Sequence, residues 1–358
     1  MYVDADEYVS PWELRLPQVL VAVLAALQKA PRIDLRSTRA VKPLLERLAE
    51  LARASQSVGE TAKKLADVAG IPFLAAALKI SSEVAARFSK AALGQRQELL
   101  DLTRNLILEV RQQLPPDVAE LVFVIDNLEK VPEQSLEGGH SLHEVLFARD
   151  LPALDLPAHM VMTYPISLNY STHELDRAYP GAIRTTLPMV GVRRPPQDAT
   201  RGDDPEGIAA MTRLLARRVA PSLFAGTDVV EQIVRLSGGC VRDLLRIVGE
   251  LPIVGEPPFT ARMVDDVVND FRNDYARLLQ GKPYVARLPE IARTGEIPDD
   301  LDPGSKREIL LGLVALEYDT DTWFDIHPLV KRTRSYVRAE QAEERREATG
   351  APPKGEPG

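Results

Sequence analysis

Apolar runs and helical stripes alternate along this chain of 358 residues, and one apolar run ends abruptly in acids. Residues 121–129 read Leu-Val-Phe-Val-Ile-Asp-Asn-Leu-Glu. A near-continuous apolar run is typical of a strand that is buried on both faces, as in the parallel sheet of an α/β domain. Acids at the carboxyl end of such a strand lie where α/β sheets bind ligands. The pattern predicts a buried strand ending at Asp126, with a simple polar turn as the alternative.

Three other segments have the character of strands. Residues 158–168 are largely apolar and predict a strand that ends near Thr163. Residues 185–192 predict a shorter third strand, and the first residues, 1–9, also resemble a strand. Helical spacing of apolar side chains predicts helices over most of the remainder: 11–54 in two helices with the second at about 38–54, then 95–113, 206–219, 227–236, 240–250, 260–279 and 306–316.

A sharp loop is predicted before the helix that begins near residue 240. Gly238 and Gly239 permit backbone angles that other residues avoid, so the chain can turn there into the helix. Arg242 then falls in the first helical turn and projects from it. The alternative is a surface arginine that pairs with Asp243 or Glu250.

In this order the elements resemble an AAA+ ATPase, of the branch that contains origin-recognition and STAND-type ATPases. The resemblance covers roughly residues 1–275. It implies that residues 121–129 are the Walker B strand, that Thr163 is sensor 1 and that Arg242 is the sensor 2 arginine of the lid. It further implies ATP and Mg²⁺ as cofactors, with Asp126 holding the Mg²⁺ through water.

The Walker A segment of that family is absent from the sequence. No G-x-x-x-x-G-K-[ST] occurs, and Gly281-Lys282 precedes a proline and follows no strand. In that fold the first strand and its P-loop precede the segment that residues 1–9 resemble, and the first strand is internal to the sheet. We therefore expect an N-terminally incomplete chain; the alternative is a degenerate paralogue that completes its sheet in another way.

The catalytic residues depart from the family pattern in one place. Many AAA+ proteins carry a glutamate directly after the Walker B aspartate, but this chain has Asn127, and an amide cannot act as a base. Glu129 lies two residues further on and is the candidate for orienting the attacking water. Arg177 and Arg184 are candidates for an arginine finger without further support in the sequence.

The expected fold class is α/β, a three-layer αβα P-loop NTPase-like parallel sheet without its first strand and P-loop. Four domains are predicted. Residues 1–192 form an AAA+-like core with a helical insertion at about 55–92, and residues 193–280 form a helical lid. Residues 281–333 form a small winged-helix-like unit with a hairpin at 317–326, and residues 334–358 form a charged, disordered tail. His327, which follows the hairpin, is expected to be a packing or hydrogen-bonding residue rather than a ligand or base.

Composition narrows the function further. A net charge of −8 gives no general affinity for nucleic acid. Cys240 is the only cysteine, which suggests a reducing compartment; it is expected to fill space in the lid loop rather than to be a reactive thiol. The first residues lack a signal peptide, and the apolar run Val68 to Leu78 is too short to cross a bilayer. We expect a bacterial-type cytoplasmic protein without a membrane partner.

The sequence thus predicts a nucleotide-gated switch or remodelling ATPase, inactive without its P-loop, that acts on an unknown protein partner or on itself. The alternative is a catalytically inactive scaffold of ATPase fold that binds protein or DNA through its C-terminal unit. A DNA-binding initiator is a third possibility, supported by basic residues that nearby glutamates dilute: Lys331, Arg332, Arg334 and Arg338.

Overall fold

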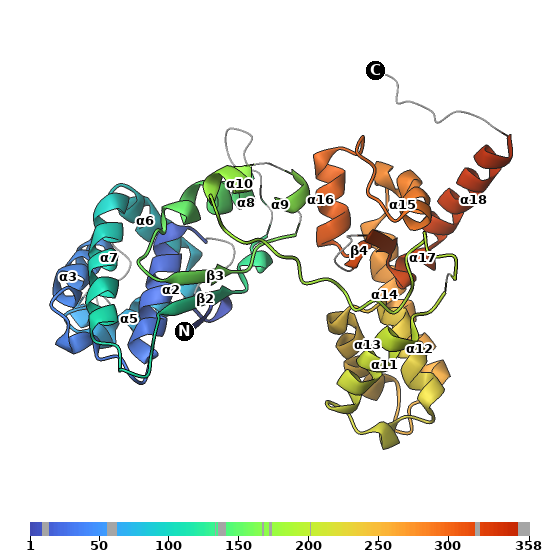
Figure 1. Cartoon of the computed structure of the whole chain (residues 1–358), viewed down its shortest axis with the longest axis horizontal. Helices are drawn as coiled ribbons and strands as arrows, with labels where there is room; N and C mark the ends of the chain where they lie inside the picture. The colour runs from blue at the N-terminus through green and yellow to red at the C-terminus, as the bar shows by residue number, and fades with distance from the viewer. Residues whose placement is uncertain are drawn as a thin grey trace. The chain divides into compact units, whose positions relative to one another are not determined.

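The computed structural model describes residues 1–8, 14–55, 63–132, 134, 141–166, 168–171, 174–200, 202–318 and 323–349. The chain divides into two compact units, Met1–Ile183 and Arg184–Gly358. Each is a mixture of helices and short strands and is described by itself (Figure 1).

The first unit contains a parallel sheet of three strands in the order β1-β2-β3. Its strands are β1 (Tyr2–Asp4), β2 (Val122–Asp126) and β3 (His159–Met162). Asp4 lies opposite Asp126, and Ile125 lies opposite Met162, so the three carboxyl ends share one edge. The predicted α/β class is confirmed, as are the strands that end at Asp126 and near Thr163.

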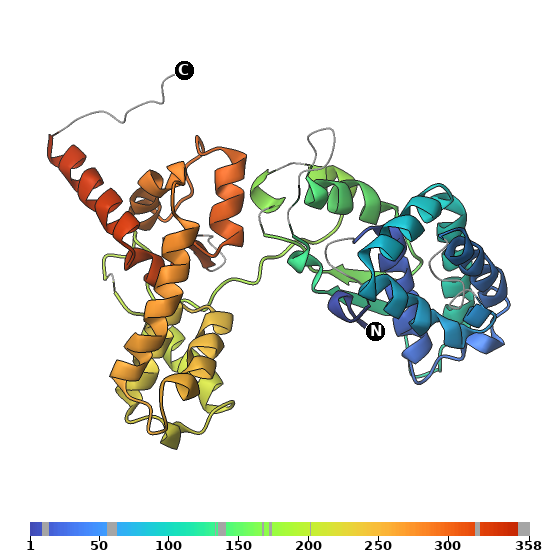
Figure 2. The same ribbon diagram turned by 180° about the vertical axis from the view of Figure 1, so that it is seen from behind.

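Helices cover one side of this sheet (Figures 1 and 2). The central helix, α2 (Leu16–Lys29), packs on β1 and is buried all round from Leu16 to Leu27, since every side chain in that stretch but Gln18 is apolar. The Nε2 of Gln18 donates to the carbonyl of Ala85 and to the hydroxyl of Ser89. The surrounding helices are α3 (Val41–Ala54), α5 (Ile71–Ile80), α6 (Ser82–Leu93) and α7 (Arg96–Gln112).

The two faces of the sheet differ in burial. Val3, Phe123 and Ile125 are at most 1% exposed and belong to the core formed with the helices. On the opposite face Tyr2 is 59% and Val161 54% exposed. The prediction of a strand buried on both faces is therefore wrong in this structure, because the described residues supply a helical layer to only one face. The three-layer arrangement is accordingly not seen.

The remaining elements of the first unit are short. They are α1 (Ala5–Tyr8), η2 (Leu35–Ser37), η3 (Val68–Gly70), η4 (Leu128–Lys130), α8 (Leu142–Glu144), η5 (Val145–Asp150), η6 (Leu151–Ala153), α9 (Leu168–Ser171) and α10 (Glu174–Ala178). The first strand is thus shorter than the predicted 1–9, since α1 begins at Ala5. A helix start at Ser10 and Pro11 was also predicted from the sequence, but those residues lie outside the described ones.

Residues 185–192 do not form the predicted third strand of the sheet. They belong to the second unit, where Met189 makes an isolated parallel bridge to Tyr318. The segment contains Pro188, which has no N–H to donate to a strand ladder, and Leu187 is 89% exposed.

Four helices of the second unit lie close to the ranges predicted for the helices of the lid. They are α11 (Pro205–Ala216), α12 (Thr227–Ser237), α13 (Val241–Val254) and α14 (Ala261–Leu278), with the short η7 (Pro221–Leu223) after α11. Asp204 and Thr260 cap two of them by accepting hydrogen bonds from backbone N–H groups of the first turn. The apolar stripes of all four meet in one core.

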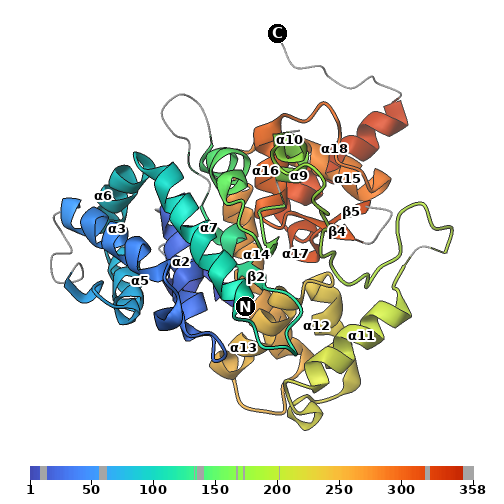
Figure 3. The same cartoon turned by 60° about the vertical axis from the view of Figure 1, so that its left-hand side comes forward.

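A hairpin and further helices complete the second unit. Strands β4 (Ala315–Tyr318) and β5 (Trp323–Ile326) pair antiparallel, as predicted, whereas the predicted Asp/Thr turn lies outside the described residues. Figure 3 shows this hairpin beside α15. The accompanying helices are η8 (Pro283–Arg287), α15 (Leu288–Thr294), α16 (Pro303–Leu311), α17 (Pro328–Lys331) and α18 (Arg334–Thr349).

Three boundaries differ from those drawn from the sequence. The first unit ends at Ile183, where the core was predicted to extend to residue 192. Helices α11–α14 and the hairpin belong to one compact unit, where two domains meeting at residue 280 were predicted. Residues 334–349 form α18, where a disordered tail was predicted; Tyr336, only 2% exposed, anchors the helix.

Within the described residues, no single helix combines the length and apolar character needed to cross a membrane. Val68–Ile80 and Ser82–Leu93 meet that requirement only when taken together, and they are bent by 117° at the break between them.

Candidate functional site

Polar side chains collect where the three parallel strands end. Asp4 ends β1, Asp126 ends β2, and Thr163 directly follows β3. The edge at the carboxyl ends of parallel strands is where open α/β sheets bind ligands. The structure therefore brings two of the predicted site residues, Asp126 and Thr163, to one edge of one sheet.

Asp126 is held by two hydrogen bonds. The Tyr2 hydroxyl donates to Oδ2 at 2.6 Å, and the backbone N–H of Asn127 donates to Oδ1 at 2.8 Å. The bond to Asp126 raises the pKa of the Tyr2 hydroxyl to about 12. Asp126 is half-buried, so its carboxylate stays accessible at the sheet edge.

Asn127 forms the turn that directly follows β2. Its φ is 66°, in the left-handed region that asparagine tolerates better than most residues. Its Nδ2 donates to Oδ1 of Asp4 at 2.7 Å, which joins the ends of β1 and β2. Asn127 is therefore a turn residue that braces the strand ends.

Thr163 connects the third strand to the same turn. Its backbone N–H donates to the carbonyl of Ile125 at 3.1 Å, which extends the pairing of β3 with β2. Its Oγ1 accepts a hydrogen bond from the N–H of Leu128 at 3.1 Å. The hydroxyl thus lies against the turn that follows Asp126.

Glu129 occupies that turn, in η4, two residues after Asn127. Its Oε2 is buried and has no hydrogen-bond partner among the described residues. Its charge also contributes, with those of Asp126 and Asp4, to the raised pKa of Tyr2, so the carboxylate lies in the same electrostatic neighbourhood. A carboxylate oxygen without a donor is able to accept a hydrogen bond from a water or a ligand.

The sequence analysis missed Tyr2 and Asp4. Asp4 was open to prediction by the rule that singled out Asp126, because it follows the apolar Val3 at the end of a strand. No local signal points to Tyr2, whose partner lies 124 residues away. No group of three metal-ligating side chains occurs within the described ranges.

The remaining predicted site residue, Arg242, lies in the first turn of α13 in the second unit. It is exposed, and its guanidinium makes no hydrogen bond or ion pair among the described residues. The alternative of pairing with Asp243 is wrong: Asp243 is 4% exposed and bonds to His327 at 3.1 Å and to Arg246 at 3.3 Å. Glu250 does not pair with Arg242 either.

The chain turns sharply before Arg242, as the two glycines predicted. Gly238 and Gly239 have φ of 58° and 80°. Cys240, 3% exposed, fills space beneath the turn, and burial raises the pKa of its thiol, which argues against a reactive cysteine. We refer to Ser237–Val241 as the elbow.

His327 is a buried hydrogen-bonding residue, as predicted. It is fully buried, and the N–H of Leu329 donates to its Nδ1 at 3.1 Å. Nδ1 is therefore unprotonated, and Nε2–H donates to Asp243. Burial acts to raise the pKa of Asp243, but the hydrogen bonds from His327 and Arg246 and the positive charge of Arg246 outweigh it, so the pKa lies below its ordinary value.

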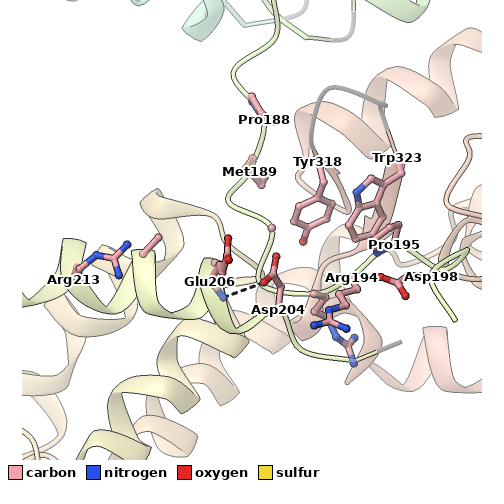
Figure 4. Close-up of a pocket in the computed structure, with 14 residues that line it drawn as sticks. Pro188, Met189, Arg194, Pro195, Asp198, Asp204, Glu206, Arg213, Tyr318 and Trp323 are labelled. Atoms are coloured by element: carbon pink, nitrogen blue, oxygen red, sulfur yellow. Dashed lines mark hydrogen bonds between the residues drawn. The ribbon is translucent and has the colours of Figure 1, made fainter. Parts of the chain in front are cut away.

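A separate open cavity of about 610 Å³ lies within the second unit. Figure 4 shows that the segment with Pro188 and Met189, the start of α11 and the aromatic pair Tyr318 and Trp323 line it. Its walls carry opposite charges, including those of the exposed residues Arg213 and Glu206. None of the predicted site residues lines this cavity.

Comparisons with known proteins add no assignment: no family model matches the chain, and neither the curated proteins nor the solved structures yielded a match.

Proposed function

We propose that the chain is an AAA+ or STAND-like ATPase that acts as a nucleotide-gated switch or remodelling factor. One observation carries the proposal: Asp126 and Thr163 end adjacent parallel strands, and Thr163 bonds to the turn that follows Asp126. A metal-anchoring acid beside a polar residue on the next strand is the arrangement that the resemblance implies for Walker B and sensor 1.

The roles follow from the chemistry of each group. Asp126 would anchor Mg²⁺ through water, since Mg²⁺ keeps several waters and needs few protein carboxylates. Glu129, with a buried oxygen that lacks a donor, would orient the attacking water. Arg242, unpaired and exposed, would contact the γ-phosphate. The described residues offer no backbone cradle for the phosphates, so the site fits the metal better than the triphosphate.

The bare face of the sheet is consistent with a missing neighbour. No described residue pairs with the outer edge of β3, and Val161 on that strand is 54% exposed. A further parallel strand beside β3, followed by a helix on the bare face, would produce the three-layer sheet. That strand would also bring a P-loop to the edge that holds Asp126 and Thr163.

The inactive scaffold remains the alternative, and one contact favours it. The Tyr2 hydroxyl occupies Oδ2 of Asp126, the oxygen that would face a hydrated metal. In a scaffold this bond would simply close the sheet edge, and partner binding through the C-terminal unit would be indifferent to it.

Turnover by a version of the protein that includes an upstream P-loop distinguishes the two. We expect Mg²⁺-dependent ATP hydrolysis that Glu129→Gln lowers with little change in nucleotide affinity, and that Arg242→Ala lowers by about a hundredfold. Glu250→Gln, on the exposed surface of α13, is the matched control and should leave turnover unchanged. An ATPase whose turnover ignores both Glu129→Gln and Arg242→Ala would contradict the assigned roles, and absence of nucleotide binding would favour the scaffold.

A further inference from the structure

The elbow before Arg242 is held from one side by the hairpin. The hydroxyl of Tyr318, at the end of β4, donates to the carbonyl of Gly238 at 2.6 Å. Tyr318 is 1% exposed and stacks on Trp323 of β5, with ring centroids 4.5 Å apart and planes inclined by 19°. The hydrogen bond therefore joins the elbow to β4, and the stacked rings connect it to β5.

The segment Pro188–Val192 holds the same elbow from another direction. The N–H of Val190 donates to the carbonyl of Gly239 at 3.2 Å, and the N–H of Met189 donates to the carbonyl of Glu317 at 2.9 Å. Figure 4 shows Met189 near Tyr318. A Cβ atom on Gly239 would lie 1.8 Å from the carbonyl oxygen of Val190, so the backbones are in direct contact.

Residues on the far side of Arg242 are tied to the same hairpin. Asp243 accepts from Nε2 of His327, which directly follows β5. His327 also packs on Tyr275 of α14, with ring centroids 4.9 Å apart. Hairpin contacts thus flank Arg242 on both sides, while its own side chain is left unpaired and exposed.

We propose that Tyr318 and His327 are positioning residues for Arg242: the β4–β5 hairpin holds the elbow and thereby fixes the direction in which the arginine projects. This inference rests on the proposed function for the use of Arg242, although the geometry is independent of it. A partner that displaced the hairpin would, by the same contacts, redirect Arg242.

The thiol of Cys240 is a natural reporter of the contact between the hairpin and the elbow. Cys240 is the only cysteine of the chain, lies in the elbow and is 3% exposed, so its reaction with a thiol reagent such as DTNB requires the elbow to open. Tyr318→Phe removes only the hydroxyl, and we expect the thiol of the folded chain to react about three- to tenfold faster, the range for one net hydrogen bond. Tyr284→Phe is the control, because that hydroxyl is also buried but has no hydrogen-bond partner among the described residues.

A nitroxide label separates positioning from general loosening of the helix. In a Cys240→Ala background, a label on Arg242→Cys should become more mobile when Tyr318→Phe or His327→Gln is added. A label on Glu250→Cys, exposed near the other end of α13, should not change. Equal gains at both positions, or a thiol rate in Tyr318→Phe no faster than in Tyr284→Phe, would overturn the inference. Neither measurement uses nucleotide, so a failure of the ATPase proposal would be seen separately.

Discussion

The strand ends of the first unit and the elbow of the second unit hold the candidate residues in opposite ways. At the strand ends, polar side chains bond mainly to one another beside a sheet face that is left bare, as in the contacts of Tyr2 with Asp126 and of Asn127 with Asp4. At the elbow the neighbours of Arg242 are buried, and backbone contacts fix them. The side chains at the strand ends are therefore able to rearrange, whereas the backbone of the elbow is fixed by its contacts.

Burial of charge shows the same contrast. Asp150 in the first unit faces Arg15 and Arg96, yet burial dominates and raises its pKa. Asp243 in the second unit is buried too, but its hydrogen bonds and nearby charges lower its pKa. A buried carboxylate is well stabilised only where donors meet it closely, as they do at the elbow.

The largest expected effect compares the two faces of the sheet. Phe123→Ala should cost about 3–5 kcal/mol of stability, because it empties a fully buried site. Val161→Ala, on the bare face, should cost less than about 0.5 kcal/mol. Urea unfolding of the first unit measures both, and a cost for Val161→Ala near that of Phe123→Ala would show that the face is covered.

The next largest effect on stability is expected at Gly239, where the elbow lies against the Val190 carbonyl. Gly239→Ala should destabilise the second unit by about 3 kcal/mol, since the added Cβ meets the Val190 carbonyl and φ is +80°. Gly249→Ala, on α13 where a Cβ meets open space, should instead stabilise by about 0.5–1 kcal/mol. Chemical denaturation measures the free energy of unfolding of both variants. Equal effects would mean that the elbow can accommodate a Cβ atom at residue 239.

Asp243 gives the elbow a dependence on pH. Its folded pKa lies below the ordinary 3.8, so its contribution is fully present above about pH 5 and is lost as pH falls through the folded pKa. Asp243→Asn should cost about 1–3 kcal/mol at pH 7 and progressively less below about pH 4. Asp270→Asn, exposed on α14, is the control. A cost that stays constant down to pH 2 would show that the carboxylate is not what stabilises the cluster.

The smallest effect is a titration at the strand ends. Tyr2 should titrate near pH 12, and Asp126→Asn should move that pKa back toward 10, because the main cause of the shift is the bond to Asp126. NMR of ring-labelled tyrosine follows the change, with Asp117→Asn as a remote control. A Tyr2 pKa near 10 in the wild-type chain would mean that the Tyr2 hydroxyl does not bond to Asp126.

Local patterns predicted the helices and strand ends well, and non-local contacts account for what they missed. The stripes of α7 and of α11–α14 match their predicted ranges closely, and Gly238-Gly239 indicated the elbow. The apolar run of β2 was taken to be buried on both faces, but burial depends on layers that the run itself does not encode. The Tyr2–Asp126 and His327–Asp243 contacts join residues 124 and 84 positions apart, and no spacing rule reaches that far.

Isothermal titration with ATP and Mg²⁺ tests the central claim, that Asp126 anchors a nucleotide-bound metal, most directly. The chain of 358 residues should show no low-micromolar binding, about −8 kcal/mol, because its sequence supplies no phosphate cradle. A version of the protein that includes an upstream P-loop should bind, and Asp126→Asn should remove the dependence of binding on Mg²⁺. Low-micromolar binding by the chain itself, or Mg²⁺-dependent binding by the version with the P-loop that survives Asp126→Asn unchanged, would contradict the account.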